Sequence, residues 1–128
     1  MQPFVARKDA QIMGLEILAV VFGLCAFLQQ LRGKLVRIYV DNVGGERALS
    51  KGAARSMDHN LLIHSVWHMS VRYGFAVWVE RVPSSLNIAD EPSREQYDTL
   101  RALGARWVEP NLAPELWDPT AWVRAVAP

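Results

Sequence analysis

Residues 11–31 form the most apolar stretch of the chain and limit the folds that are open to it. It contains one charged residue, Glu16, and residues 17–28 carry no charge at all. That uncharged run is too short to span a bilayer, and two glutamines follow it. The stretch also lacks the small-residue cleavage site of a secretory signal. We therefore expect a buried helix from Asp9 to Leu31 in a globular domain, with no membrane partner.

Composition narrows the class of protein further. The 128 residues are 51% apolar and 21% charged, which is typical of one globular domain with a real core. The formal net charge is only +1, so any nucleic-acid binding must come from a local basic patch. The single cysteine, Cys25, has no disulfide partner and lies in the apolar helix. It predicts a core thiol in a reducing, intracellular compartment, either cytoplasm or nucleus.

After the first helix, β-rich and helical segments alternate. We expect strands at 36–40 and 75–82, a loop at 42–45, and helices at 46–50, from Ser56 or Asp58 to Tyr73, and at 95–103. Strands separated by helices predict an α/β fold with a short parallel sheet of two main strands and crossover helices. We assign residues 1–106 to this domain. Residues 107–128, rich in Trp and Pro, predict a strap laid over it.

Three carboxylates stand where such a fold can bring them together. Asp41 ends the first strand, Asp90 follows the second, and Glu16 lies within the apolar helix. Sites in parallel sheets form beyond the carboxyl ends of the strands, and hard oxygen ligands suit Mg²⁺ or Mn²⁺. The sequence thus suggests a divalent-metal site. The alternative is that Asp41 caps a turn, Asp90 caps a helix and Glu16 pairs with an arginine.

Three segments together resemble the ribonuclease H domain of retrotransposon reverse transcriptases, above all those of elements that carry a tyrosine recombinase. They read QIMGLEILAVVFGL, VRIYVDNVGGERALSKG and ERVPSSLNIADEPSR, and the resemblance covers about residues 11–94. It implies a ribonuclease H-like domain that hydrolyses the RNA strand of RNA–DNA hybrids with two metal ions. It also implies that Glu16, Asp41 and Asp90 are catalytic and bind the metal.

The resemblance further implies which residues contact the substrate. Asn87 precedes Asp90 by three residues, as in the family, and Asn42 follows Asp41. Arg47 and Lys51, on the short helix, would face the phosphates of the hybrid, a contact that does not depend on sequence. The alternative for these basic side chains is an ordinary solvated helix face.

The chain departs from the family pattern at its start. In the family, the first catalytic aspartate lies on a three-stranded antiparallel unit at the start of the domain. This chain has no counterpart of that aspartate or of that unit. We expect an N-terminally truncated domain that is incomplete as a nuclease, or a non-catalytic module that binds protein or nucleic acid. Strand 36–40 would then have an unpaired edge. We expect a homodimer through that edge, or cover from residues near Phe4 or from the tail. Free exchange of the Ile38 and Val40 amides in a monomer would count against this.

Overall fold

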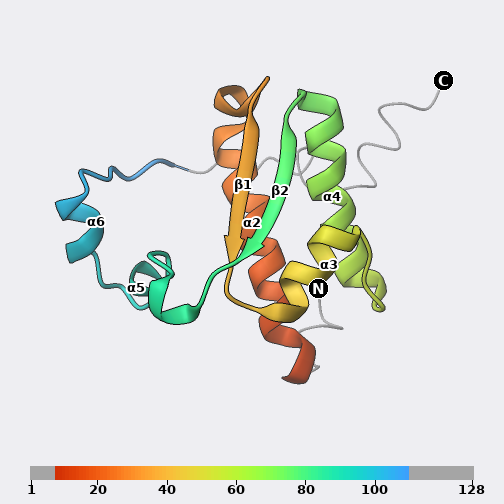
Figure 1. The fold of residues 1–128 in the computed structure, drawn as a ribbon, viewed down its shortest axis with the longest axis horizontal. Helices are drawn as coiled ribbons and strands as arrows, with labels where there is room; N and C mark the ends of the chain where they lie inside the picture. Colours follow the sequence, from red (N-terminus) through yellow and green to blue (C-terminus); the bar gives the residue numbers. More distant parts are fainter. Residues whose placement is uncertain (1–7, 110–128) are drawn as a thin grey trace.

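The structure is a computed structural model that describes residues 8–109, and it is a mixed α/β domain (Figure 1). Within this part of the chain, a parallel sheet of two strands is accompanied by three longer helices and three short ones. In chain order the elements are α2 (Lys8–Leu31), β1 (Leu35–Val40), α3 (Val43–Lys51), α4 (Met57–Tyr73), β2 (Ala76–Arg81), η1 (Ser84–Leu86), α5 (Asp90–Ser93) and α6 (Asp98–Ala102). The expected α/β class and parallel pairing are confirmed.

The sheet register runs from Leu35 opposite Ala76 to Val40 opposite Arg81. The Lys34 carbonyl accepts from the Ala76 amide at 2.9 Å, and the Val40 carbonyl accepts from the Val82 amide at 2.9 Å. Since backbone groups alternate sides along a strand, the even-numbered residues of β1 face β2 and the odd-numbered ones face the other edge. Our choice of Ile38 and Val40 as reporters of that edge was therefore wrong.

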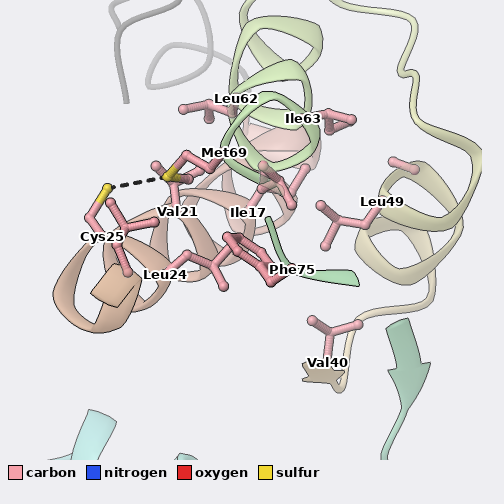
Figure 2. Packing of buried hydrophobic residues seen from close by; sticks show 13 residues of the cluster. Ile17, Val21, Leu24, Cys25, Val40, Leu49, Leu62, Ile63, Met69 and Phe75 are labelled. Atoms are coloured by element: carbon pink, nitrogen blue, oxygen red, sulfur yellow. Dashed lines mark hydrogen bonds between the residues drawn. The ribbon is translucent and has the colours of Figure 1, made fainter. Parts of the chain in front are cut away.

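The core lies between α2, α4 and one face of the sheet (Figure 2). Its largest fully buried apolar side chains are Ile17, Val21, Leu49, Ile63, Val66 and Met69. The Cys25 thiol donates to the Met69 sulfur at 3.7 Å, and burial raises the pKa of Cys25 to about 11. Cys25 is thus a packed thiol with little thiolate at neutral pH, as the sequence predicted.

Only one side of α2 joins that core, so the expected buried helix is confirmed in part. Ile12, Leu15 and Phe27 on the other side are exposed, and the helix departs from helical dihedrals at Phe27. By length and composition alone, Ile12–Leu31 is also apolar enough to cross a membrane, and 33% of this stretch is buried in the fold. A domain without a membrane partner stays a prediction.

Glycines and polar caps set the helix ends. Gly52 and Gly74 adopt left-handed conformations that end α3 and α4, as expected, and Ser56 is the N-cap of α4. The predicted loop at 42–45 was wrong: the Asn42 side chain accepts from the Gly45 amide at 2.8 Å, so α3 begins at Val43. The predicted helix 95–103 was also wrong in extent, because the chain turns through a positive φ of 60° at Glu95 before α6.

The predicted Trp- and Pro-rich strap falls mostly on residues 110–128, which lie outside the described residues, as does Phe4. Of the proposed strap, only residues 107–109 are described, and they are exposed.

Candidate functional site

Glu16 and Asp41 come together at the carboxyl end of β1. Glu16 lies on α2, one position before the buried Ile17, and Asp41 follows the last residue of β1. The first turn of α3 closes over them at a glycine: a Cβ on Gly45 would lie 3.7 Å from Glu16 Oε2. The positive end of the α3 dipole therefore points toward the carboxylates.

The Glu16 carboxyl is poorly compensated. Its Oε2 atom is buried and has no hydrogen-bond partner within residues 8–109. Burial, a hydrogen bond with the Asp41 side chain and repulsion by the Asp41 charge raise the pKa of Glu16 to about 7, and a hydrogen bond from the Asn42 backbone N–H lowers it. Two neighbouring acids in this environment favour either a shared proton or a bound cation.

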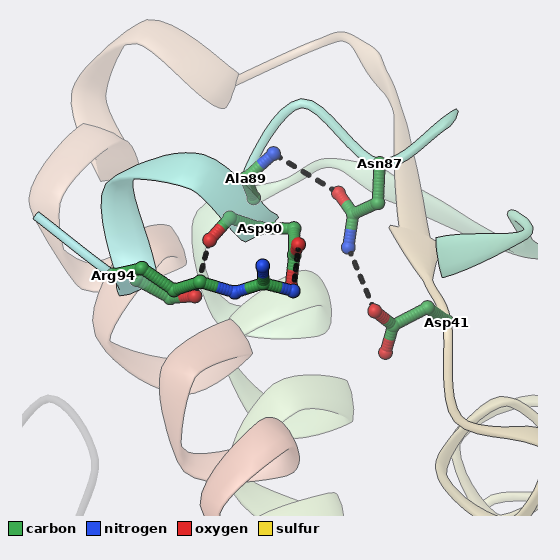
Figure 3. Close-up of polar contacts among 6 residues, drawn as sticks. Asp41, Asn87, Ala89, Asp90 and Arg94 are labelled. Atoms are coloured by element: carbon green, nitrogen blue, oxygen red, sulfur yellow. Dashed lines mark hydrogen bonds and ion pairs between the residues drawn. The ribbon is translucent and has the colours of Figure 1, made fainter. Parts of the chain in front are cut away.

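Asn87 ties the segment after β2 to this pair of acids (Figure 3). Its side-chain amide donates to Asp41 Oδ2 at 3.2 Å, and its carbonyl oxygen accepts from the Ala89 amide at 3.1 Å. The second contact fixes which way the amide points, because its oxygen is already engaged. Asn87 thereby positions the start of α5, where Asp90 lies, beside the end of β1.

Asp90 is turned toward a partner of its own. Arg94, one helical turn later, donates to Asp90 Oδ2 at 2.6 Å in an ion pair that is open to solvent (Figure 3). Asp90 occupies the first position of α5, after the cap residue Ala89. The Asp90 side chain therefore forms an ion pair and does not cap the helix, so the capping alternative was wrong.

All three predicted acids nevertheless line one cavity of about 360 Å³, together with Asn87, Tyr39 and small residues of α2. Within the described part of the chain, however, no group of three His, Cys, Asp or Glu side chains is close enough to hold a metal ion. Glu16 and Asp41 fit a hard divalent cation, because one buried oxygen lacks a partner and both ligands are carboxylates. Asp90 would join them only after leaving Arg94.

The residues predicted to contact substrate are divided between two places. Asn42 and Asn87 use their side chains within the protein, one to cap α3 and the other to hold Asp41. Arg47 and Lys51 instead line a second cavity of about 760 Å³, together with Arg55. Met13 lines it too and precedes Glu16 by about one turn of α2, so the two cavities are close neighbours.

Ser56, expected from the sequence only as a helix cap, also lines the basic cavity. Ser56 Oγ is buried without a hydrogen-bond partner in the described residues and makes no side-chain cap contact. It stands at the N-terminus of the 17-residue helix α4, whose dipole attracts anions. The sequence could have indicated this basic cavity, because basic residues recur every four positions at 47, 51 and 55, directly before Ser56.

Comparisons of the chain with protein-family models, with curated proteins and with solved structures found no match. The arrangement of the acidic and basic cavities is therefore the observation from which a function can be argued.

Proposed function

We propose that this chain is a ribonuclease H-like domain, of the kind found in retroelement polymerases, acting on the RNA strand of RNA–DNA hybrids with Mg²⁺ or Mn²⁺. The observation that carries the proposal is the pairing of Glu16 with Asp41 at the end of a parallel strand. One oxygen of that pair is buried and has no partner within the described residues. In a purely structural role, a proton held between Glu16 and Asp41 would have to offset this cost.

In this proposal Glu16 and Asp41 hold the cation, and Asp90 becomes a third ligand when Arg94 releases it. A divalent ion bound there would lower the pKa of a bound water and stabilise charge on the leaving oxygen. The chain's own part is to keep these oxygens in place. Asn87 orients Asp41, while α3 keeps its positive end beside Glu16. At pH 7 a cation would also favour the ionised form of Glu16.

The basic cavity supports the choice of a nucleic-acid substrate. Arg47, Lys51 and Arg55 line it, and Ser56 adds a hydroxyl next to the N-terminus of α4. Such a set suits a backbone phosphate, which basic side chains, hydroxyls and helix N-termini all bind. Its position about one helical turn from Glu16 would let one strand contact both cavities. Recognition of RNA would then rest on the 2′-hydroxyl and on hybrid shape.

A second candidate function is a non-catalytic module that binds nucleic acid. It is favoured by one observation: within residues 8–109 no three acids stand close enough to hold a metal ion, whereas the basic cavity is already assembled. The resemblance implies four catalytic acids, and only three of them have counterparts here.

The two functions are separated by incubating the full chain with an RNA–DNA hybrid labelled on each strand, over a titration of Mg²⁺ and of Mn²⁺. We expect cleavage of the RNA strand only, and no cleavage by Asp41→Asn. The matched control is Asp98→Asn, at an exposed acid on α6, which should cleave like the wild type. Hybrid binding without cleavage would establish the binding module instead. If the chain neither binds nor cleaves the hybrid, both proposed functions are rejected.

A further inference from the structure

A third cavity, of about 400 Å³, lies at the outer edge of β2. Figure 1 shows α3 and α4 on the side of β2 away from β1, and residues of these three elements line the cavity. They are Glu46, Ser50, Trp67, Val77, Trp78 and Val79. We call this the edge cavity. It shares no lining residue with the acidic or the basic cavity, so it is separate from the proposed nuclease site.

The outer edge of β2 turns backbone donors and acceptors toward the edge cavity. The amides of Ala76 and Val82 donate to carbonyl groups at the two ends of β1. Because backbone groups alternate sides along a strand, the N–H and C=O groups of Val77 and Val79 point away from β1. Within residues 8–109 the sheet has no strand beyond β2. β2 also has no proline, so this edge can accept a further strand.

Two tryptophan side chains in the edge cavity are held in place by hydrogen bonds. Trp67 Nε1 donates to the Leu49 carbonyl at 3.0 Å, and Trp78 Nε1 donates to Glu80 Oε1 at 2.9 Å. Trp78 is nevertheless 58% exposed. Among the described residues no basic side chain lies over either ring. The rings are therefore fixed in position and open to a ligand, and the face of an indole ring attracts cations.

Glu46 gives the edge cavity a negative charge. It is half-buried in the first turn of α3, and the Ser50 hydroxyl donates to its Oε1 atom at 3.3 Å. It forms no ion pair with any residue of the described part of the chain. A carboxylate beside aromatic rings suits a basic side chain and repels a phosphate. The edge cavity thus differs in charge from the basic cavity at the other side of α3.

We propose that the outer edge of β2 binds an extended peptide segment of a partner protein, which pairs with Val77 and Val79 and places an arginine in the edge cavity. Main-chain hydrogen bonds to a strand edge provide affinity, and a pocket beside the edge selects the side chain. The guanidinium pairs with Glu46 and stacks on Trp67, because arginine suits both a carboxylate and an aromatic ring. This interaction does not rest on the proposed nuclease function.

The alternation of the two sheet faces sets the neighbouring positions of the peptide. Val77 and Val79 pack toward the core, so Trp78 between them lies on the opposite face of the sheet. The residues on either side of the peptide arginine point to that same opposite face. Apolar side chains are favoured there, because they cover the exposed ring of Trp78. The expected ligand is therefore an extended segment in which apolar residues flank one arginine.

Amide NMR of the full chain tests the proposal with a short peptide of alternating threonine and valine that has one central arginine. We expect the peptide to shift the indole N–H signals of Trp67 and Trp78. It should also slow exchange of the Val77 and Val79 amides at least about tenfold. The Leu35 amide, which points to the free edge of β1, is the matched control and should exchange at the same rate with and without peptide.

The substitution Glu46→Gln separates the arginine site from strand pairing. In the wild type, a peptide with glutamine in place of arginine should bind about tenfold more weakly. Glu46→Gln should weaken binding of the arginine peptide by about the same factor and leave the glutamine peptide unchanged, as measured by fluorescence anisotropy. The control Glu95→Gln, at an exposed acid after α5, should bind both peptides like the wild type. Equal affinity of the wild type for the two peptides would overturn the arginine site.

Other results would overturn the strand addition itself. The absence of any shift with the arginine peptide is one. Slow exchange of the Val77 and Val79 amides without peptide would show that the chain already covers this edge. Protection that appears without peptide and rises with protein concentration would assign the edge to a second copy. Shifts of both indole signals by single-stranded RNA and not by the peptide would assign the rings to base stacking.

Discussion

The acidic and basic cavities differ in how the chain builds them. The acidic cavity draws its charged side chains from α2, from the end of β1 and from α5, segments that lie far apart in sequence. The basic cavity takes all of its basic side chains from one stretch of nine residues, from Arg47 to Arg55. The charges of the first cavity therefore depend on the whole fold, whereas the Arg and Lys side chains of the second come from a single helix and the turn after it. Substitutions in one cavity should therefore leave the function of the other unchanged.

The largest expected effect is on cation binding at the acidic cavity. Glu16→Gln combined with Asp41→Asn removes both close carboxylates, so Mn²⁺ affinity should fall by about 100-fold or more. Isothermal titration calorimetry with Mn²⁺ measures this directly. Arg47→Gln, in the basic cavity, should bind Mn²⁺ like the wild type. Equal Mn²⁺ affinity in the double variant would show that the carboxylates are not a cation site.

The basic cavity should control how binding depends on salt. Arg47→Gln together with Lys51→Gln should weaken binding of an RNA–DNA hybrid and reduce the slope of log affinity against log salt by about 1 for each phosphate that the variant no longer neutralises. Fluorescence anisotropy at several salt concentrations gives that slope. Arg72→Gln, on α4 beside Tyr73 and outside both cavities, is the matched control. A slope unchanged by the double variant would assign these residues to a solvated surface.

The pH dependence of stability isolates Glu16. Its pKa is about 7 in the folded protein and near the ordinary 4.5 when unfolded. Between these two pH values the folded state binds more protons than the unfolded state. The contribution of Glu16 to the free energy of unfolding is therefore fully present below pH 4.5 and is lost as pH rises through 7. We expect a loss on the order of 1 kcal/mol, because water screens a partly exposed carboxyl. Urea titrations from pH 4 to 8 should show this slope in the wild type and not in Glu16→Gln.

The smallest effect should come from the ion pair of Asp90 with Arg94. The Arg94 side chain is 66% exposed, so Arg94→Ala should change the free energy of unfolding by no more than about 0.5 kcal/mol. The same variant frees Asp90 to face Glu16 and Asp41, and Mn²⁺ should bind more tightly. Asp98, paired weakly with Arg101, offers the control Arg101→Ala, which should leave Mn²⁺ affinity unchanged. Weaker Mn²⁺ binding in Arg94→Ala would contradict this role.

The architecture was readable from the sequence because its signals are local. Glycines at 52 and 74 mark helix ends by their left-handed conformation, and β-rich runs mark the two strands. The start of α3 was missed because Val43-Gly44-Gly45 has poor helix propensity, and the Asn42 cap compensates for it. The final helix was misplaced because nothing local announced the positive φ at Glu95.

The candidate site was predictable in its members and not in its contacts. The placing of Glu16, Asp41 and Asp90 around one cavity follows from a parallel sheet and the loop after β2. That Asp90 pairs with Arg94, and that Asn87 holds Asp41, depends on side-chain conformations in α5 and its preceding turn. Sequence patterns describe spacing along the chain and do not choose between neighbouring partners of similar chemistry.

The Asn42 cap fixes more than the beginning of one helix. Because α3 starts at a set position beside Asp41, it holds Arg47 and Lys51 at a set distance and angle from the two acids. Inserting a single residue after Glu46 would rotate the rest of the helix by about 100° and carry both basic side chains away from their cavity. The carboxylates would stay where they are. In the proposed function, the position of Arg47 and Lys51 on α3 would set which spacing between neighbouring phosphates the chain accepts.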